Sequence, residues 1–337
     1  MITHFTKIPE PKKSVAYSCY WHFAAKRYDV FTKRLNNTHG PWTDEPAIRD
    51  NRFTNVFRAS DRVSQFLINL QYGEDRIEQI FFKTILFKIF NKIETYQYLE
   101  KELGKISLST FDLSKYNDLL TFRMASGKTI YSAAYIMPSA GRVFGYKFKH
   151  TNHLALIEKM IKDKVYDIIS DARSLQKVYE ILLSYPSLGS FLAFQYAIDL
   201  NYSTMTNFSE MDFVVAGPGA KSGIMKCFEH LGGYSYEDVI KLMADTQEEE
   251  CIRLNIDLPN LWGRKLQLID CQNLFCEVDK YLRITRPELN GPSGRTRIKQ
   301  KYVLSRGSIS LFFPPKWNIN DKLKESWQAK VNVGMFS

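Results

Sequence analysis

The chain has 337 residues, of which 45% are hydrophobic and 24% are charged, a composition that excludes a disordered or fibrous protein. Lys and Arg number 46 against 36 Asp and Glu, and the net charge of +10 favours a polyanionic partner. Lys83 and Lys88 interrupt the most apolar run, at residues 80–90, so no membrane-spanning segment is expected. A polar N-terminus without a secretory signal and five scattered cysteines predict a cytoplasmic protein with free thiols.

Hydrophobic residues at helical spacing predict a mainly α-helical body. The expected helices cover residues 15–35, 54–70, 76–103, 153–164, 171–184, 191–200, 209–216, 220–231, 236–251 and 266–281. Thr54 and Ser209 have the short polar side chains that cap helix N-termini. Residues 122–137 are instead rich in small and β-prone residues, and we expect a small β-hairpin there.

The chain changes character at Gly291. Residues 291–337 hold nine Lys and Arg but two Asp and Glu, so we expect a helical domain at residues 15–290 followed by a basic C-terminal extension. Within this extension cations recur at every second residue, at Arg295, Arg297 and Lys299. An extended segment of this kind suits contact with nucleic-acid phosphates, and a solvated edge strand is the alternative interpretation.

Residues 213–224 predict a helix, a tight Gly-Pro-Gly turn and a second helix. Glycine allows close approach of a phosphate, and the free N–H groups at a helix start bind anions. Gly217, Gly219, Lys221 and Ser222 are therefore candidate contacts to the DNA backbone. The segment resembles the helix-hairpin-helix element of DNA glycosylases, and an ordinary turn between two helices is the alternative.

A glycosylase needs a carboxylate, because breaking an N-glycosidic bond builds positive charge on the deoxyribose. Asp270 is the preferred candidate, since it shares a helix face with Asn273 and Glu277 in an otherwise apolar segment. A buried polar network is the alternative explanation of this stripe. The other candidate carboxylates are Asp238, Asp212 and Glu210.

Lys221 stands where glycosylases that also cut the strand carry a Schiff-base lysine. Phosphate contact explains it equally well, so simple base excision is expected. Neither residues 127–129 nor residues 217–222 complete a nucleotide-binding P-loop. Cys271 and Cys276 lack the additional ligands of a metal site, so neither a metal nor a cofactor is expected.

Asn55, Arg58, Arg62 and Gln65 follow one another at spacings of three and four residues. Their planar donor and acceptor groups suit recognition of a base or a sugar hydroxyl. A solvated helix face would accommodate the same pattern, and the spacing alone leaves both interpretations open.

Several segments together resemble the α-glutamyl/putrescinyl-thymine pyrophosphorylase-like family, a helical, DNA-glycosylase-like group linked to hypermodified pyrimidines in phage DNA and to bacterial defence. The matching segments are residues 20–25, 41–45, 53–64, 217–223, 270–277 and 294–299. The resemblance implies a helix-hairpin-helix fold that acts on DNA with bulky base modifications. By matching segment, the base pocket would contain Asn55, Arg58, Asp61, Asp270, Gln272, Asn273 and Glu277.

These observations predict a monofunctional DNA glycosylase that excises a hypermodified pyrimidine, such as glucosylated hydroxymethylcytosine, from double-stranded phage DNA and leaves an abasic site. Asp270 would stabilise the cationic sugar, and the target base would be flipped out of the duplex. One alternative is a DNA base-modifying enzyme that joins an amine or amino acid to an activated hydroxymethylpyrimidine. The other is a non-catalytic DNA-binding protein. No membrane partner is expected.

Overall fold

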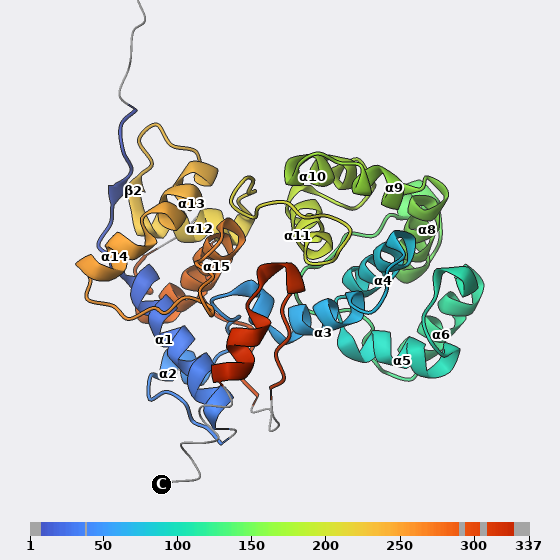
Figure 1. The fold of residues 1–337 in the computed structure, drawn as a ribbon, viewed down its shortest axis with the longest axis horizontal. Helices are drawn as coiled ribbons and strands as arrows, with labels where there is room; N and C mark the ends of the chain where they lie inside the picture. The colour runs from blue at the N-terminus through green and yellow to red at the C-terminus, as the bar shows by residue number, and fades with distance from the viewer. Residues whose placement is uncertain (1–7, 38, 290–293, 304–308, 327–337) are drawn as a thin grey trace, which may run out of the picture. The chain divides into compact units, whose positions relative to one another are not determined.

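The computed structural model describes residues 8–37, 39–289, 294–303 and 309–326. The chain divides into two compact units (Figure 1). Unit 1 contains the described residues up to Asp61 and from Val214 onward, and unit 2 is Arg62–Phe213. The predicted domain boundary between residues 290 and 291 lies outside the described residues.

Unit 1 combines helices with a two-stranded antiparallel sheet. Its elements are β1 (Lys12–Lys13), α1 (Tyr17–Asn36), α2 (Pro46–Arg49), η1 (Arg58–Ser60), α12 (Pro218–Cys227), β2 (Phe228–His230), α13 (Tyr236–Asp245), α14 (Gln247–Arg253), α15 (Leu268–Thr285) and η3 (Pro315–Trp317). The sheet pairs Lys12 with His230 and Lys13 with Phe228. Its two strands are far apart in the sequence, so the pairing joins the start of the chain to the end of α12.

Helix α15 forms the centre of unit 1, with α1, α12 and α13 packed against it (Figure 1). The ring centroid of Tyr20 on α1 lies 4.6 Å from that of Phe275, and the Tyr20 hydroxyl donates to Cys271 O at 3.3 Å. On the α12 side, a Cβ atom at Gly223 would lie 2.1 Å from Phe275 O. The two helix backbones therefore approach so closely that only glycine fits at this position.

Unit 2 contains helices and no strand. Its elements are α3 (Arg62–Gln71), α4 (Ile77–Phe90), α5 (Ile93–Leu103), η2 (Leu108–Thr110), α6 (Leu113–Ala125), α7 (Gly141–Phe144), α8 (Lys149–Lys162), α9 (Val165–Ser170), α10 (Leu175–Leu183) and α11 (Ser190–Asn201). Helix α4 is buried along nearly its whole length and contacts α3, α8, α9 and α11. Lys88 on α4 pairs with Asp199 on α11 at 2.9 Å, and both side chains are almost fully buried.

The prediction of a mainly α-helical protein is confirmed, and the described residues include one small two-stranded sheet. Helices α1, α8, α10, α11 and α15 lie close to where hydrophobic periodicity placed them. The single helix expected at residues 76–103 is two helices, because Asn91 adopts a left-handed conformation with φ of 48° between α4 and α5. The helix-hairpin-helix glycosylase fold is not confirmed.

The β-hairpin expected at residues 122–137 is wrong. The first four of these residues complete α6, and the others form an irregular loop. The loop forms hydrogen bonds with neighbouring helices instead of with a second strand. Ser132 N–H donates to Phe90 O, and Thr95 Oγ1 donates to Ile130 O, both at 2.9 Å. Local β-propensity is therefore outweighed by tertiary contacts.

The two helices predicted to begin at Thr54 and Ser209 are also wrong. The N–H of Thr54 donates to the carboxylate of Glu277, and α3 begins only at Arg62. After Ser209 the chain makes a local turn and stays irregular until Gly217 caps α12. No helix therefore leads directly into the Gly-Pro-Gly turn, which removes the first half of the expected helix–turn–helix arrangement.

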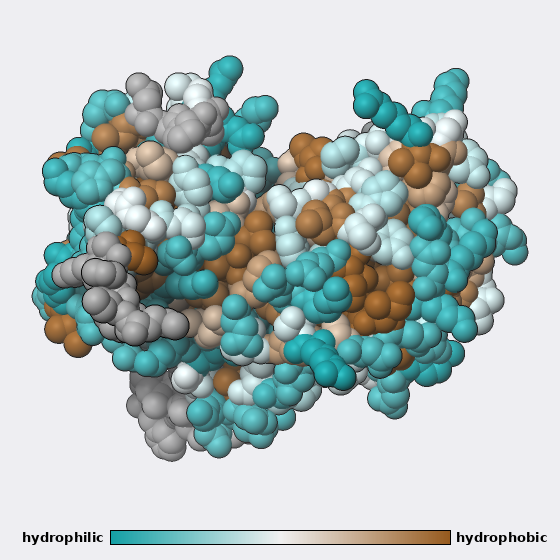
Figure 2. Space-filling model, turned by 90° about the horizontal axis from the view of Figure 1, so that it is seen from above, coloured by the Kyte–Doolittle hydropathy of each residue, from teal (hydrophilic) through white to brown (hydrophobic). Residues whose placement is uncertain are grey.

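Among the described residues, no helix combines the length and the apolar character that crossing a membrane requires. Figure 2 shows hydrophobic residues in separate patches between hydrophilic ones on the face that it presents. All five cysteines are free, as expected from their scattered positions.

The substitution Gly223→Ala tests the close contact of α12 and α15. We expect it to lower the free energy of unfolding by about 1–3 kcal/mol, because the added methyl group meets a backbone carbonyl. Gly141→Ala on α7 is the matched control, since its Cβ would lie no closer than 3.4 Å to another atom. Urea denaturation followed by circular dichroism measures both variants. Equal stability of the two variants would contradict the close approach.

Candidate functional site

Two carboxylates of α15 hold residues 54–61, which we call the pinned loop. Glu277 Oε2 accepts a hydrogen bond from Thr54 N–H at 3.1 Å, and Asp270 Oδ1 accepts from Arg58 N–H at 2.7 Å. The two acids lie two helical turns apart, so both face the loop. Hydrogen bonds to ionised groups are stronger than neutral ones, and these two fix the loop on α15.

Asn55 connects the pinned loop to α1. Its N–H donates to Asp61 Oδ1 and its Nδ2 to Ser60 O, each at 2.8 Å. Arg27 on α1 donates from Nη2 to Asn55 Oδ1. The side chain predicted to contact a base therefore organises the loop and keeps one amide proton for other partners.

Charges of both signs gather around the pinned loop. Burial raises the pKa of Asp61 to about 6, although the N–H of Asn55 and the guanidinium of Arg27 oppose the shift. Burial also lowers the pKa of Arg27, against the attraction of Asp61 and Glu277. Arg58 has an exposed fraction of only 3%. Perturbed titration of this kind is typical of functional sites and of structural charge networks alike.

Asp270 joins the start of α15 to the pinned loop. It is the third residue of the helix, and its Oδ2 accepts from Gln267 N–H at 3.0 Å in a capping box. The side chain is 5% exposed. Each carboxylate oxygen thus accepts one backbone N–H. This placement makes Asp270 a positioning residue for the loop.

Asn273 lies between Asp270 and Glu277 on the same face of α15. It is 8% exposed, and its side-chain amide makes no hydrogen bond to a described residue. An amide offers both a donor and an acceptor, so Asn273 keeps its full hydrogen-bonding capacity for a ligand. The neighbouring Gln272 is fully buried and donates from Nε2 to Cys276 Sγ at 3.3 Å.

The Gly-Pro-Gly turn leads directly into α12, with Gly217 as the N-cap. Lys221 is exposed, and its Nζ lies 5.3 Å from the centre of the Tyr236 ring. A Cβ atom at Gly219 would lie 3.0 Å from Cys276 Sγ, so this glycine permits packing against α15. Gly217 is buried and Gly219 is partly buried, whereas Lys221 is exposed to solvent. Contact of these residues with DNA stays a prediction.

Ser222 belongs to a buried charge network that the sequence analysis missed. Its hydroxyl donates to Asp279 Oδ1 at 2.8 Å, and Lys226 Nζ lies 3.0 Å from the same oxygen. Arg283 pairs with the other oxygen of Asp279. Asp279 and Arg283 are four residues apart on one helix, and this spacing could have predicted their ion pair from the sequence. Ser222, with 1% exposure, faces this network instead of the solvent.

The cations Arg295, Arg297 and Lys299 are exposed on an irregular segment of unit 1 that bends at Arg297 and Lys299. Backbone hydrogen bonds of 3.1 Å join its residues 300 and 302 to residues 52 and 50. The segment therefore lies beside the chain that leads into the pinned loop. Contact of these cations with phosphates stays a prediction.

The structure brings together Asn55, Arg58, Asp61, Asp270 and Glu277 from the predicted pocket. The other candidate acids lie elsewhere. Asp238 forms an exposed capping box with Ser235 at the start of α13, and Glu210 and Asp212 belong to unit 2.

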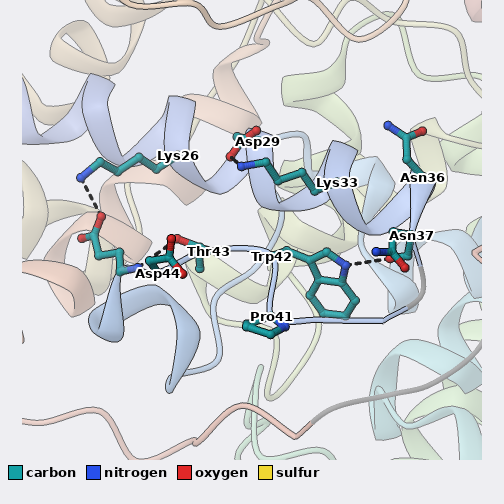
Figure 3. A pocket seen from close by; sticks show the side chains of 10 residues that line it. Lys26, Asp29, Lys33, Asn36, Asn37, Pro41, Trp42, Thr43 and Asp44 are labelled. Carbon is teal, nitrogen blue, oxygen red and sulfur yellow. Dashed lines mark hydrogen bonds and ion pairs between the residues drawn. The ribbon is translucent and has the colours of Figure 1, made fainter.

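A hollow of about 640 Å³ opens beside α1 and was not predicted from the sequence (Figure 3). Trp42 lines it together with charged side chains. Lys26 pairs with Glu45 and Lys33 with Asp29, both at 2.6 Å. Because both lysines already have acidic partners, the hollow offers little net positive charge to a phosphate.

The family model described as "5-hmdU DNA kinase, helical domain" matches residues 14–291, and the chain belongs to this family. A relative, the 5-hmdU DNA kinase of Bacillus phage SP10, is 26% identical over 319 residues, which are 88% of this chain and 49% of the relative. The chain thus spans about half the length of this relative. No solved structure matches the chain.

These matches overturn the expected enzyme class. A kinase adds a phosphoryl group and leaves the base in place, whereas the expected DNA N-glycosylase would remove the base. The predictions of base excision and of an abasic product are therefore wrong. A catalytic role of Asp270 stays a prediction that these matches do not test. Two of the residues behind that expectation have structural roles, since Gly219 permits packing against α15 and Asp270 caps this helix. The link to modified pyrimidines in DNA is supported, and membership of the pyrophosphorylase-like family is not confirmed.

Asp270→Ala tests the bridge between α15 and the pinned loop. We expect a loss of about 2–4 kcal/mol in the free energy of unfolding, because the helix loses its cap and Arg58 N–H loses its acceptor. Asp238→Ala removes the corresponding exposed cap of α13 and should cost about 1 kcal/mol. Chemical denaturation measures both, and faster amide hydrogen exchange at Arg58 should appear in Asp270→Ala alone. Equal costs would contradict the bridging role.

Asp61→Asn tests the raised pKa of the loop carboxyl. Folding raises this pKa from 3.8 to about 6, so the stabilising contribution is present below pH 4 and is lost as the pH rises through 6. Between pH 4 and 7 the wild type should lose about 1–2 kcal/mol more stability than Asp61→Asn. Melting temperatures across this range measure the difference, with the exposed Asp212→Asn as control. Parallel profiles of Asp61→Asn and wild type would disprove the assignment.

Proposed function

We propose that this chain is a DNA base-modifying enzyme that acts on the hydroxymethyl group of 5-hydroxymethyluracil while the base stays attached to the sugar. Membership of the 5-hmdU DNA kinase family and the relative from Bacillus phage SP10 support this assignment. The net charge of +10 supports DNA as the partner. Phosphorylation of the hydroxymethyl oxygen is the first candidate reaction, and joining an amine to an activated base is the second.

The placement of Asn273 between two engaged carboxylates carries the proposal for the base site. Uracil presents one N–H group flanked by carbonyl oxygens, and an asparagine amide matches this edge with one acceptor and one donor. In a duplex this edge is paired with the opposite base. The target base therefore leaves the stack before Asn273 binds it, at a cost of a few kcal/mol.

The charged groups of the pinned loop support a role in phosphoryl transfer. Such a reaction needs positive charge near the transferred group and a carboxylate that accepts the proton of the attacking hydroxyl. We assign the first role to Arg58 and the second to Asp61, whose raised pKa of about 6 suits proton transfer near neutral pH. Asp270 and Glu277 position the loop that carries both residues.

The reaction is tested with matched duplexes that carry one 5-hydroxymethyluracil or one thymine. Each duplex is incubated with the protein, ATP and Mg²⁺, digested to nucleosides and examined by mass spectrometry. We expect the nucleoside of the modified duplex to gain one phosphoryl group, with no free base released. Asp61→Asn should lower the rate by about 10²–10⁴-fold, the usual contribution of a general base. Unchanged nucleosides, both with ATP and with ATP plus an amine, would refute the proposal.

Asn273→Ala tests recognition of the base. The wild type should bind the 5-hydroxymethyluracil duplex more tightly than the same duplex with a cytosine in its place, and Asn273→Ala should reduce this preference about 10-fold. Asn69→Ala, an exposed amide on α3, is the control and should keep the preference. Fluorescence anisotropy measures binding, and melting temperatures verify the fold. An unaltered preference in Asn273→Ala would exclude this residue as the base contact.

A further inference from the structure

Residues 119–157 of unit 2 contain no Asp or Glu. The same stretch carries five cations, Arg123, Lys128, Arg142, Lys147 and Lys149. Acidic residues make up 36 of the 337 residues of the chain, so a stretch of this length would ordinarily hold several. The segment includes the end of α6, the irregular loop, α7 and most of α8. Its charge suits an anionic partner.

The same segment exposes aromatic side chains to solvent. Phe122 is 68% exposed, Tyr146 47% and Phe148 42%. Large apolar side chains at such exposure mark interaction sites when they occur together. We call these three rings, with the exposed cations Arg142 and Lys147, the aromatic–cation surface.

Partly buried contacts join the end of α6 to the first turn of α8. Thr121, which directly precedes Phe122, bonds through Oγ1 to Nε2 of His150 at 2.9 Å. The ring of Phe148 stacks on His150, with centroids 5.4 Å apart and planes 18° from parallel. The segment is therefore an ordered platform built on the packed pair α6 and α8 (Figure 1).

The buried side chain of Asn152 fixes the position of Tyr146. Its Oδ1 accepts from Tyr146 N–H at 3.0 Å, and its Nδ2 donates to Tyr146 O at 2.8 Å. Lys147, the next residue, already lies 5.6 Å from the centre of the Phe148 ring. The cation thus lies over one of the exposed rings, and the combination of cations with aromatic rings binds the phosphates and the bases of nucleotides.

We propose that the aromatic–cation surface binds an unpaired DNA strand, with bases stacked on the exposed rings and phosphates bound by Arg142 and Lys147. The lack of acidic residues favours a polyanion over a protein partner of mixed charge, and the exposed rings offer faces on which bases can stack. The inference rests on the proposed function in taking DNA as the ligand.

The test uses an unmodified fluorescent oligothymidine and the full chain. We expect binding that weakens with salt, and a loss of about 10-fold or more in the double variant Phe122→Ala/Phe148→Ala. Arg142→Gln/Lys147→Gln should reduce the slope of log K against log salt by about 1.4, or about 0.7 for each phosphate contact. Ile168→Ala and Lys162→Gln, at exposed positions of unit 2 outside the segment, should bind as the wild type does. Melting temperatures verify that all variants fold.

Failure of the wild type to bind the oligothymidine, or wild-type affinity in the double aromatic variant, would overturn the inference. Binding to anionic phospholipid vesicles that depends on Phe122 and Phe148, with oligothymidine binding unaffected by their loss, would assign the surface to membranes and also overturn it. The probe carries no modified base, so this failure is separate from that of the proposed function. If the protein binds the oligothymidine as expected but leaves the 5-hydroxymethyluracil nucleoside unaltered in the mass-spectrometry assay, only the proposed function is refuted.

Discussion

The contact between α12 and α15 is the constraint on which the rest of unit 1 depends. Gly223 lets the two helix backbones meet, and Asp279 is fully buried at the same interface. A buried carboxylate is costly unless it is paired and hydrogen-bonded. Ser222, Lys226 and Arg283 meet this requirement from both helices. The network therefore fixes how the helices lie against each other as well as how closely.

With α15 held in this way, its polar face determines where the pinned loop lies. Asp270 and Glu277 accept backbone N–H groups of Arg58 and Thr54, respectively. Within the loop only Arg58–Ser60 form a short 3-10 helix, and α3 begins only after the loop ends. This arrangement holds Asp61 and the buried side chain of Arg58 on a backbone that two carboxylates of α15 bind.

The same geometry explains why a polar stripe on a helix predicted the wrong chemistry. A carboxylate among apolar residues indicates either structural pairing or catalysis, and spacing does not separate the two. Both carboxylates of the stripe have backbone partners, whereas the amide of Asn273 has none among the described residues. The amide of Asn273, and not the carboxylate of Asp270 or Glu277, is therefore our candidate for contact with a base that remains attached to its sugar.

The sequence alone determined the helical class, most helix positions and the grouping of Asn55, Arg58 and Asp61 with the 270–277 segment. These features follow from hydrophobic periodicity within one helix and from segment resemblance, both of which are readable along the chain. Only the tertiary structure decided which N–H groups are taken by distant carboxylates, which glycines serve close packing and that Lys12 pairs with His230. These partners lie far apart along the chain, and neither local spacing nor propensity contains information about which of them meet.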